Sequence, residues 1–163
     1  MKQDEEFNSI ISDLLSSPTV IEMKKYRQHY NVSTFEHSVS VAYIGYKICK
    51  KLNLDYVSMA RAGMLHDLFL YDWREERPYQ GFFKKHAFSH PDIALTNAEK
   101  ICSLNNKEKD IIRNHMWPVT FYRLPHSREA FLITLVDKYA TISESVNYYK
   151  ENIHQKFRKH VIN

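Results

Sequence analysis

The sequence has few of the residues that interrupt helices or cross-link chains. Its 163 residues include three glycines, five prolines and two cysteines. So little glycine and proline favours long helices over a turn-rich β architecture. Cys49 and Cys102 lack CxxC spacing, and we interpret them as reduced, buried residues rather than a disulfide or thiolate metal site. The fold class predicted is therefore all-α.

Membrane and targeting signals are also missing. No apolar run approaches the roughly 18 residues of a membrane span, and the first residues lack the apolar segment of a signal peptide. The net charge of +4 comes without a long block of like charge, which argues against a nucleic-acid partner. We therefore expect a soluble, cytoplasmic protein that uses neither membrane nor nucleic acid.

The overall composition is that of a globular chain, with 44% hydrophobic and 26% charged residues. No internal repeat or low-complexity segment marks a domain boundary. A chain of this length most simply forms one domain, residues 1–163, with a proper hydrophobic core. The sequence alone predicts no oligomeric state.

An apolar run at residues 64–70 contains an adjacent His66–Asp67 pair. Burying a charge or an unpaired imidazole costs several kcal/mol, so neither side chain belongs there without a strong partner. A cation bound by both would resolve the conflict. Further ligands for such a cation are therefore the feature to look for elsewhere in the chain.

Apolar spacing predicts three helices before this pair, over residues 4–16, 18–29 and 34–52. The third begins with a capping box formed by Ser33 and Glu36. His37 follows in its first turn, in line with an apolar stripe, and is expected to point inward. By itself, such a residue could equally be a core histidine bonded to a carbonyl.

Asp55 is expected to cap a helix over residues 56–71, which carries His66 and Asp67. Small residues around Gly63 let the helix that carries His37 approach closely. Residues 72–89 break the helical pattern and predict a long loop, either functional or simply amphipathic. His90–Pro91 then opens the next helix, with the proline at its first position.

A further helix follows Asn105 and ends near His115, before a loop at residues 117–127. Ser127 is expected to cap a helix to about residue 147. Asp137 lies on the inner face of this helix, where a buried carboxylate needs a cation, either a basic side chain or a metal. A last helix, to about residue 160, has a packing stripe, made of Tyr149, Ile153, Phe157 and Val161.

His37, His66–Asp67 and Asp137 together resemble the H…HD…D signature of the HD-domain superfamily of metal-dependent phosphohydrolases. The resemblance covers roughly residues 30–145. His90 and His115 match in order and context the two additional histidines of the members that bind two metals. The chain lacks the His-His doublet of the cyclic-dinucleotide phosphodiesterases, and it has Leu68-Phe69-Leu70 where they carry Ile-Gly-Lys. That substrate class is therefore disfavoured.

The resemblance implies a helical bundle with one or two divalent transition-metal ions. In a two-ion site, one ion would lie on His37, His66 and Asp137 and the second on His90 and His115, with Asp67 bridging. Imidazole and carboxylate ligands suit Fe, Mn, Ni, Co or Zn, and the lack of thiolates argues against a structural zinc. Metal-activated water would then attack phosphorus, with His66 and Asp67 at the catalytic centre.

Several cationic side chains could hold a small phosphorylated substrate, either a nucleotide or another metabolite. The candidates are Arg74, Arg77, Lys84, Lys85, Arg123 and Lys138. Lys138 follows Asp137 directly and could point away from the site. His86, Asp72 and Glu144 are candidates for outer positions around the metal, but are not expected to ligate it.

Two alternatives to hydrolysis remain open. The myo-inositol oxygenase group also resembles the pattern H…HD…H…H…D, but uses a di-iron centre to activate O2. A non-catalytic sensor that binds metal or nucleotide is favoured only if ligands are missing, and the sequence contains the complete set.

Overall fold

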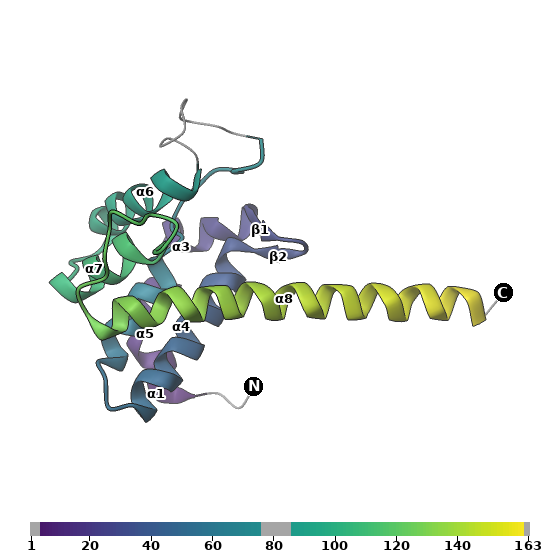
Figure 1. The fold of residues 1–163 in the computed structure, drawn as a ribbon, viewed down its shortest axis with the longest axis horizontal. Coiled ribbons are helices and arrows are strands. Elements are labelled where there is room, and N and C mark those ends of the chain that lie inside the picture. The colour runs from purple at the N-terminus through teal and green to yellow at the C-terminus, as the bar shows by residue number, and fades with distance from the viewer. Residues whose placement is uncertain (1–3, 76–85, 162–163) are drawn as a thin grey trace.

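The computed structural model describes residues 4–75 and 86–161, with side chains through residue 150. These residues form an almost entirely helical bundle with one short antiparallel hairpin, which confirms the predicted fold class (Figure 1). The elements in chain order are α1 (Glu5–Ile10), α2 (Ser12–Leu15), α3 (Pro18–Glu22), the 3-10 turn η1 (Met23–Lys25), β1 (Arg27–His29), β2 (Val32–Ser33), α4 (Thr34–Lys51), α5 (Tyr56–Leu65), α6 (His86–Ile101), α7 (Asn106–Asn114) and α8 (Arg128–Val161).

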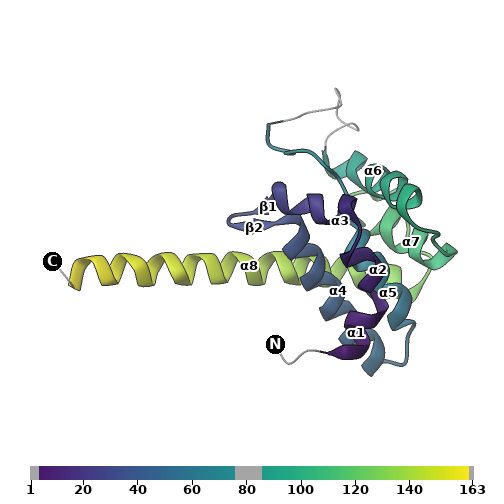
Figure 2. The same cartoon turned by 180° about the vertical axis from the view of Figure 1, so that it is seen from behind.

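Helix α8 lies along one face of the bundle, and its C-terminal half extends beyond the rest of the described chain (Figure 1). Seen from behind, α4, α5 and the N-terminal helices cover the other side of α8 (Figure 2). Among the described residues, no helix is both long enough and apolar enough to cross a membrane.

The centre of the bundle is the packing of α4 against α5. A Cβ added at Gly63 of α5 would lie 2.8 Å from the Cα of Ala42 in α4, so the two backbones approach closely. This confirms that small residues allow the helix carrying His37 to pack against the helix that precedes His66. The buried side chains around this contact include Val41, Tyr46 and Leu65.

Local sequence signals explain most of the helix starts. Ser33 and Glu36 form the predicted capping box of α4, and Asp55 accepts a hydrogen bond from the backbone N–H of Ser58 at the start of α5. The hydroxyl of Ser127 accepts from the N–H of Ala130 at 3.1 Å, as expected for the cap of α8. Each cap satisfies a backbone donor that the helix itself cannot pair.

Three predicted helix boundaries in the first half of the chain were wrong, and a fourth was wrong at Pro91. The helix over residues 4–16 is broken at Ile11. The helix predicted to residue 29 ends at Glu22, and after the η1 turn the chain enters the β1–β2 hairpin, where Tyr30 has a positive φ of 49°. Helix α5 ends at Leu65 instead of residue 71, as the N–H of Leu68 bonds back to the carbonyl of Leu65.

Helix α6 begins at His86, so His90 lies inside the helix and Pro91 is an interior proline rather than the first residue. At the other end of the chain, the two helices predicted after residue 127 are one continuous helix, α8. No glycine or proline occurs between residues 128 and 161 to end it.

Candidate metal centre

The six predicted metal ligands converge at one place in the bundle. His37 comes from the first turn of α4, His66 and Asp67 from the turn that ends α5, and the rest from three other helices. His90 lies in α6, His115 is the C-cap of α7 and Asp137 lies in α8. Five of the six are buried, and Asp137 is partly exposed.

The first group gathers around one oxygen of Asp67. Its Oδ2 lies 3.4 Å from His66 Nε2 and 3.9 Å from His37 Nε2. Asp137 Oδ1 closes this group at 3.0 Å from His37 Nε2 and 3.9 Å from His66 Nε2. His37, His66 and Asp67 place their ligand atoms within 4.8 Å of one another, close enough to hold a metal ion.

The second group gathers around the other oxygen of the same carboxylate. Asp67 Oδ1 lies 3.3 Å from His90 Nε2 and 3.6 Å from His115 Nε2. These three residues also place their ligand atoms within 4.8 Å of one another. Asp67 therefore belongs to both groups, and it presents a different oxygen to each.

Three of the histidines are oriented by the backbone of their own helix. Nδ1 of His66 lies 2.7 Å from the carbonyl of Gly63, and His90 and His115 make the same kind of contact at 2.8 Å to His86 and Ile112. Since a carbonyl only accepts, each Nδ1 carries the proton and donates it. When deprotonated at Nε2, each ring presents that lone pair to the centre, which is the tautomer a metal requires.

This arrangement leaves polar atoms that a cation would satisfy. His66 Nε2 and Asp67 Oδ1 are buried and have no hydrogen-bond partner among the residues that the structure describes. His90 Nε2 and His115 Nε2 lie 2.8 Å apart, although the tautomers above give both atoms a lone pair. Buried lone pairs that face each other are costly unless they share a positive charge. The donor set therefore fits a metal, although the metal's identity is left open.

Carboxylates on the other side of the centre also favour positive charge. Burial opposes protonation of His37, but the contacts of its ring with Asp137 and Glu144 raise its pKa to about 10. Glu144 Oε1 lies 3.0 Å from His37 Nδ1 and so orients this ring as the carbonyls orient the other three. By contrast, burial and the neighbouring rings of His90 and His66 lower the pKa of His115 to about 3.

Gln28 is a contributor that the sequence did not indicate. Its side-chain amide donates to Asp67 Oδ2 at 2.7 Å from strand β1, in a segment predicted to be helical. Glu144 was recognised as a possible outer residue from its position seven residues after Asp137 on one helical face. Gln28 offered no such signal, because its role depends on a three-residue strand.

Among the predicted substrate-binding residues, Arg74 lies beside the centre. It lines a cavity of about 440 Å³ between the hairpin, the turn at residues 73–74 and α8. The described lining residues are Arg27, His29, Tyr30, Asn31, Trp73, Arg74, Thr141, Ser145 and Tyr148, which include two guanidinium groups and no carboxylate. The ring of His29 packs edge-on against His37, with 5.6 Å between centroids, so the cavity adjoins the metal centre.

The other predicted cationic residues are placed differently. Arg123 donates to Asp92 at 2.6 Å, and the Lys138 ammonium donates to the carbonyls of Thr134 and Trp117. Arg77, Lys84 and Lys85 lie outside the described residues.

The two remaining candidates for outer positions also differ. His86 stacks on the ring of His90 with 4.5 Å between centroids, and its Nδ1 accepts from the hydroxyl of Tyr71 at 2.9 Å. Burial and nearby His90 lower the pKa of His86 to about 3, so its ring is neutral. Asp72 instead caps the turn that follows, where it accepts from the N–H of Arg74.

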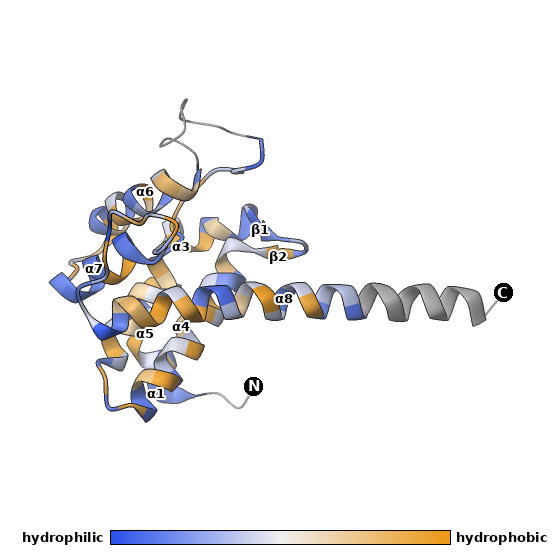
Figure 3. Ribbon diagram, viewed as in Figure 1, coloured by the Kyte–Doolittle hydropathy of each residue, from blue (hydrophilic) through white to orange (hydrophobic). Residues whose placement is uncertain are grey.

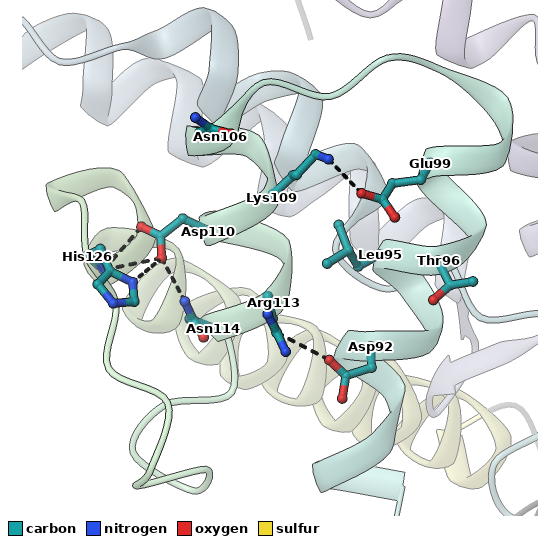
Figure 4. Close-up of a pocket in the computed structure, with 10 residues that line it drawn as sticks. All are labelled: Asp92, Leu95, Thr96, Glu99, Asn106, Lys109, Asp110, Arg113, Asn114 and His126. Atoms are coloured by element: carbon teal, nitrogen blue, oxygen red, sulfur yellow. Dashed lines mark hydrogen bonds and ion pairs between the residues drawn. The ribbon is translucent and has the colours of Figure 1, made fainter.

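A second cavity, of about 530 Å³, lies between α6 and α7 (Figure 4). Its charged residues bind one another: Lys109 pairs with Glu99 at 2.7 Å, and Arg113 with Asp92 at 3.5 Å. Asp110 accepts from Asn114 and from the backbone and ring of His126 (Figure 4). Such paired charges stabilise the α6–α7 corner and leave little free charge for a ligand.

Five helices deliver histidine and aspartate to one buried centre, where two groups of side chains could hold metal ions. Comparison with family models gives a match to the HD domain over residues 34–142, which is most of the chain. The chain belongs to the HD-domain family, whose members are typically metal-dependent phosphohydrolases. Comparisons with curated proteins and with solved structures give no match.

Proposed function

We propose that the protein hydrolyses a phosphomonoester or phosphodiester of a small metabolite with a two-metal centre. The observation that carries the proposal is the position of Asp67, whose two oxygens face two separate groups of histidine ligands. A site for a single ion would leave the second group of histidines without a ligand role. A carboxylate shared by two ions accounts for both groups of histidines.

His37, His66 and Asp137 would hold one ion, and His90 and His115 the other, with Asp67 shared. When bound, ions of this kind activate water as a nucleophile near neutral pH and neutralise charge on phosphoryl oxygens. The chain's own contribution is to fix the ligands before binding. Gln28 holds Asp67 Oδ2, and Glu144 holds the His37 ring.

The cavity lined by His29 is a further argument for an anionic substrate. Arg27 and Arg74 bring two guanidinium groups to its wall, and their planar donors match phosphate geometry. Trp73 and Tyr148 add aromatic surface that suits a ring or base on the same substrate. We assign the phosphate not being cleaved, or the remainder of the substrate, to this cavity.

Metal analysis of the purified protein, together with a panel of phosphatase and phosphodiesterase substrates, tests the proposal. We expect a divalent metal in the wild-type protein and hydrolysis of at least one substrate class. The Asp67→Ala variant should lose most of its bound metal and most of its hydrolytic activity. Asp92→Asn is the matched control, because this carboxylate is two residues from His90 but binds Arg123 at the surface.

The possible outcomes separate the alternatives. Wild-type protein without metal or hydrolytic activity would contradict the enzyme assignment and favour a sensor. Two irons per chain with oxygen consumption would favour the oxygenase chemistry. A single ion that survives both His90→Ala and His115→Ala would exclude the two-metal centre.

A further inference from the structure

The exposed apolar residues of the protein are concentrated on one surface. Of the thirteen large hydrophobic side chains exposed among the described residues, ten lie on α8 or in the loop before it. Single exposed apolar residues are ordinary, but a contiguous group marks an interaction surface. This concentration is unrelated to the metal centre, which lies inside the bundle.

Six of the ten residues form a stripe along α8. They are Phe131, Leu135, Tyr139, Ile142, Val146 and Tyr149. Successive members are three or four residues apart, so at about 100° per residue they fall within an arc of about 80°. This face of α8 is uncovered in Figure 1, and hydrophobic residues recur along it in Figure 3.

The other four residues extend the stripe at its N-terminal end. They are Val119, Phe121, Tyr122 and Leu124, in the loop between α7 and α8. The loop is held beside the stripe by Trp117, whose ring lies 5.4 Å from that of Phe131. At the opposite end, Tyr149 contacts the hairpin residue Tyr30 at 5.6 Å between rings. Ring contacts thus connect the stripe to this loop at one end and to the hairpin at the other, and we name the ten residues the α8 face.

The α8 face is large enough for a stable interface. Its ten side chains are 44–69% exposed. At roughly 150–250 Å² for a whole large side chain, they expose on the order of 1,000 Å² of apolar surface. The largest patch of a typical monomer is about 300–600 Å², and a standard interface buries about 800 Å² per partner.

We propose that the α8 face binds the α8 face of a second copy of this chain, with the two helices antiparallel. The spacing of the stripe is the same when read in either direction, to within one residue. A two-fold axis between residues 139 and 142 pairs Phe131 with Tyr149 of the second copy, Leu135 with Val146, and Tyr139 with Ile142. An isologous dimer requires this self-complementarity, whereas an unrelated partner does not.

The sequence beyond the stripe favours the antiparallel arrangement. The same spacing continues in the sequence with Ile153 and Phe157. Residues 150–159 contain four basic residues and one acidic residue. Parallel helices would bring two such segments together, and like charges in contact are destabilising.

Light scattering of the size-separated protein tests the dimer. We expect the wild type at twice the chain mass of 19.5 kDa. Leu135→Asp and Ile142→Asp should each be monomers with the helical circular dichroism of the wild type. Leu52→Asp is the matched control, because Leu52 is 58% exposed at the end of α4, and it should remain a dimer. A monomeric wild type overturns the proposal and leaves the face to a different protein, and a dimer that survives both α8 substitutions overturns it as well.

Disulfide cross-linking tests the direction of the helices. In a Cys102→Ser background, a mixture of Phe131→Cys and Tyr149→Cys chains should cross-link to each other under oxidation. Each variant alone should not, since about 27 Å separates the two positions along a helix at 1.5 Å per residue. Cross-linking of Phe131→Cys to itself, with no cross-links between Phe131→Cys and Tyr149→Cys chains in the mixture, overturns the antiparallel arrangement.

Discussion

Gly63 lies where the fold and the metal centre meet, and Gly63→Ala tests both. The new Cβ would lie 2.8 Å from the Cα and 3.1 Å from the N of Ala42, which are backbone atoms of a buried helix. Overpacking of this kind costs about 1–3 kcal/mol. Replacing a helical glycine by alanine recovers about 1 kcal/mol. Since backbone atoms cannot rotate aside, we take the upper part of the overpacking range, about 2–3 kcal/mol, and expect a net loss of about 1–2 kcal/mol in the free energy of unfolding.

Gly45→Ala is the matched control on the facing helix. Its Cβ would also meet an atom at 2.8 Å, but the atoms are Cγ and Sδ of Met59, a flexible side chain that can change rotamer. The same gain in helix propensity then makes this variant close to neutral. Urea unfolding of the metal-free variants, followed by circular dichroism, should rank Gly63→Ala below Gly45→Ala by about 1–2 kcal/mol.

The same pair should differ in metal affinity. The carbonyl of Gly63 accepts a hydrogen bond from His66 Nδ1–H, so displacement of this backbone also turns the His66 ring. Titration with Mn²⁺ against a competing chelator should show weaker binding to Gly63→Ala and wild-type binding to Gly45→Ala. Equal stability and equal affinity of the two variants would refute the close α4–α5 contact as the frame of the centre.

Three further predictions concern single contacts. Glu144→Gln should lower metal affinity by about 10–100-fold in the same titration, because the carboxylate orients His37; unchanged affinity would contradict this role. Arg74→Ala should raise the KM of the substrate that the protein hydrolyses about tenfold with little change in kcat, since a hydrogen bond to a charged group contributes about 1.5 kcal/mol. A fall in kcat with unchanged KM would exclude Arg74 as a substrate-binding residue. Burial opposes ionisation of Asp110, but its hydrogen bonds, among them those from His126 and Ser127, lower its pKa below 3.8. Its stabilisation is thus complete above pH 3.8 and lost as pH falls through the lower folded value, so the stability difference between wild type and Asp110→Asn should shrink on acidification.

The helices that carry the ligands were predictable because their signals are local. The capping box at Ser33 and the cap at Asp55 fix the starts of α4 and α5 from a few neighbouring residues. His37, His66, Asp67 and Asp137 could be singled out because histidine and aspartate in an apolar helical setting are anomalous, whereas His90 and His115 were inferred from the family resemblance. The close approach at Gly63 followed from residue size alone.

The parts that were wrong depend on contacts distant in sequence. The β1–β2 hairpin is stabilised by its position over the metal centre, where Gln28 reaches Asp67 from 39 residues away. The apolar spacing of the segment before Tyr26 is that of a helix, and no local sequence signal marks the change from helix to strand. The predicted start of α6 at Pro91 was wrong for another reason. Proline is common at the first helical position, but α6 begins five residues before Pro91.

The ends of α5 and α7 affect the order in which the centre fills. His66 and His115 are the C-caps of these helices, so both helices direct their C-termini toward it. A helix C-terminus carries about half a negative charge from aligned peptide dipoles. Asp67, Asp137 and Glu144 add three carboxylates, and the protonated ring of His37 offsets only part of this charge, so the metal-free centre favours cations. A phosphate group would be repelled there, so we expect the metal ions to bind first and the substrate only afterwards.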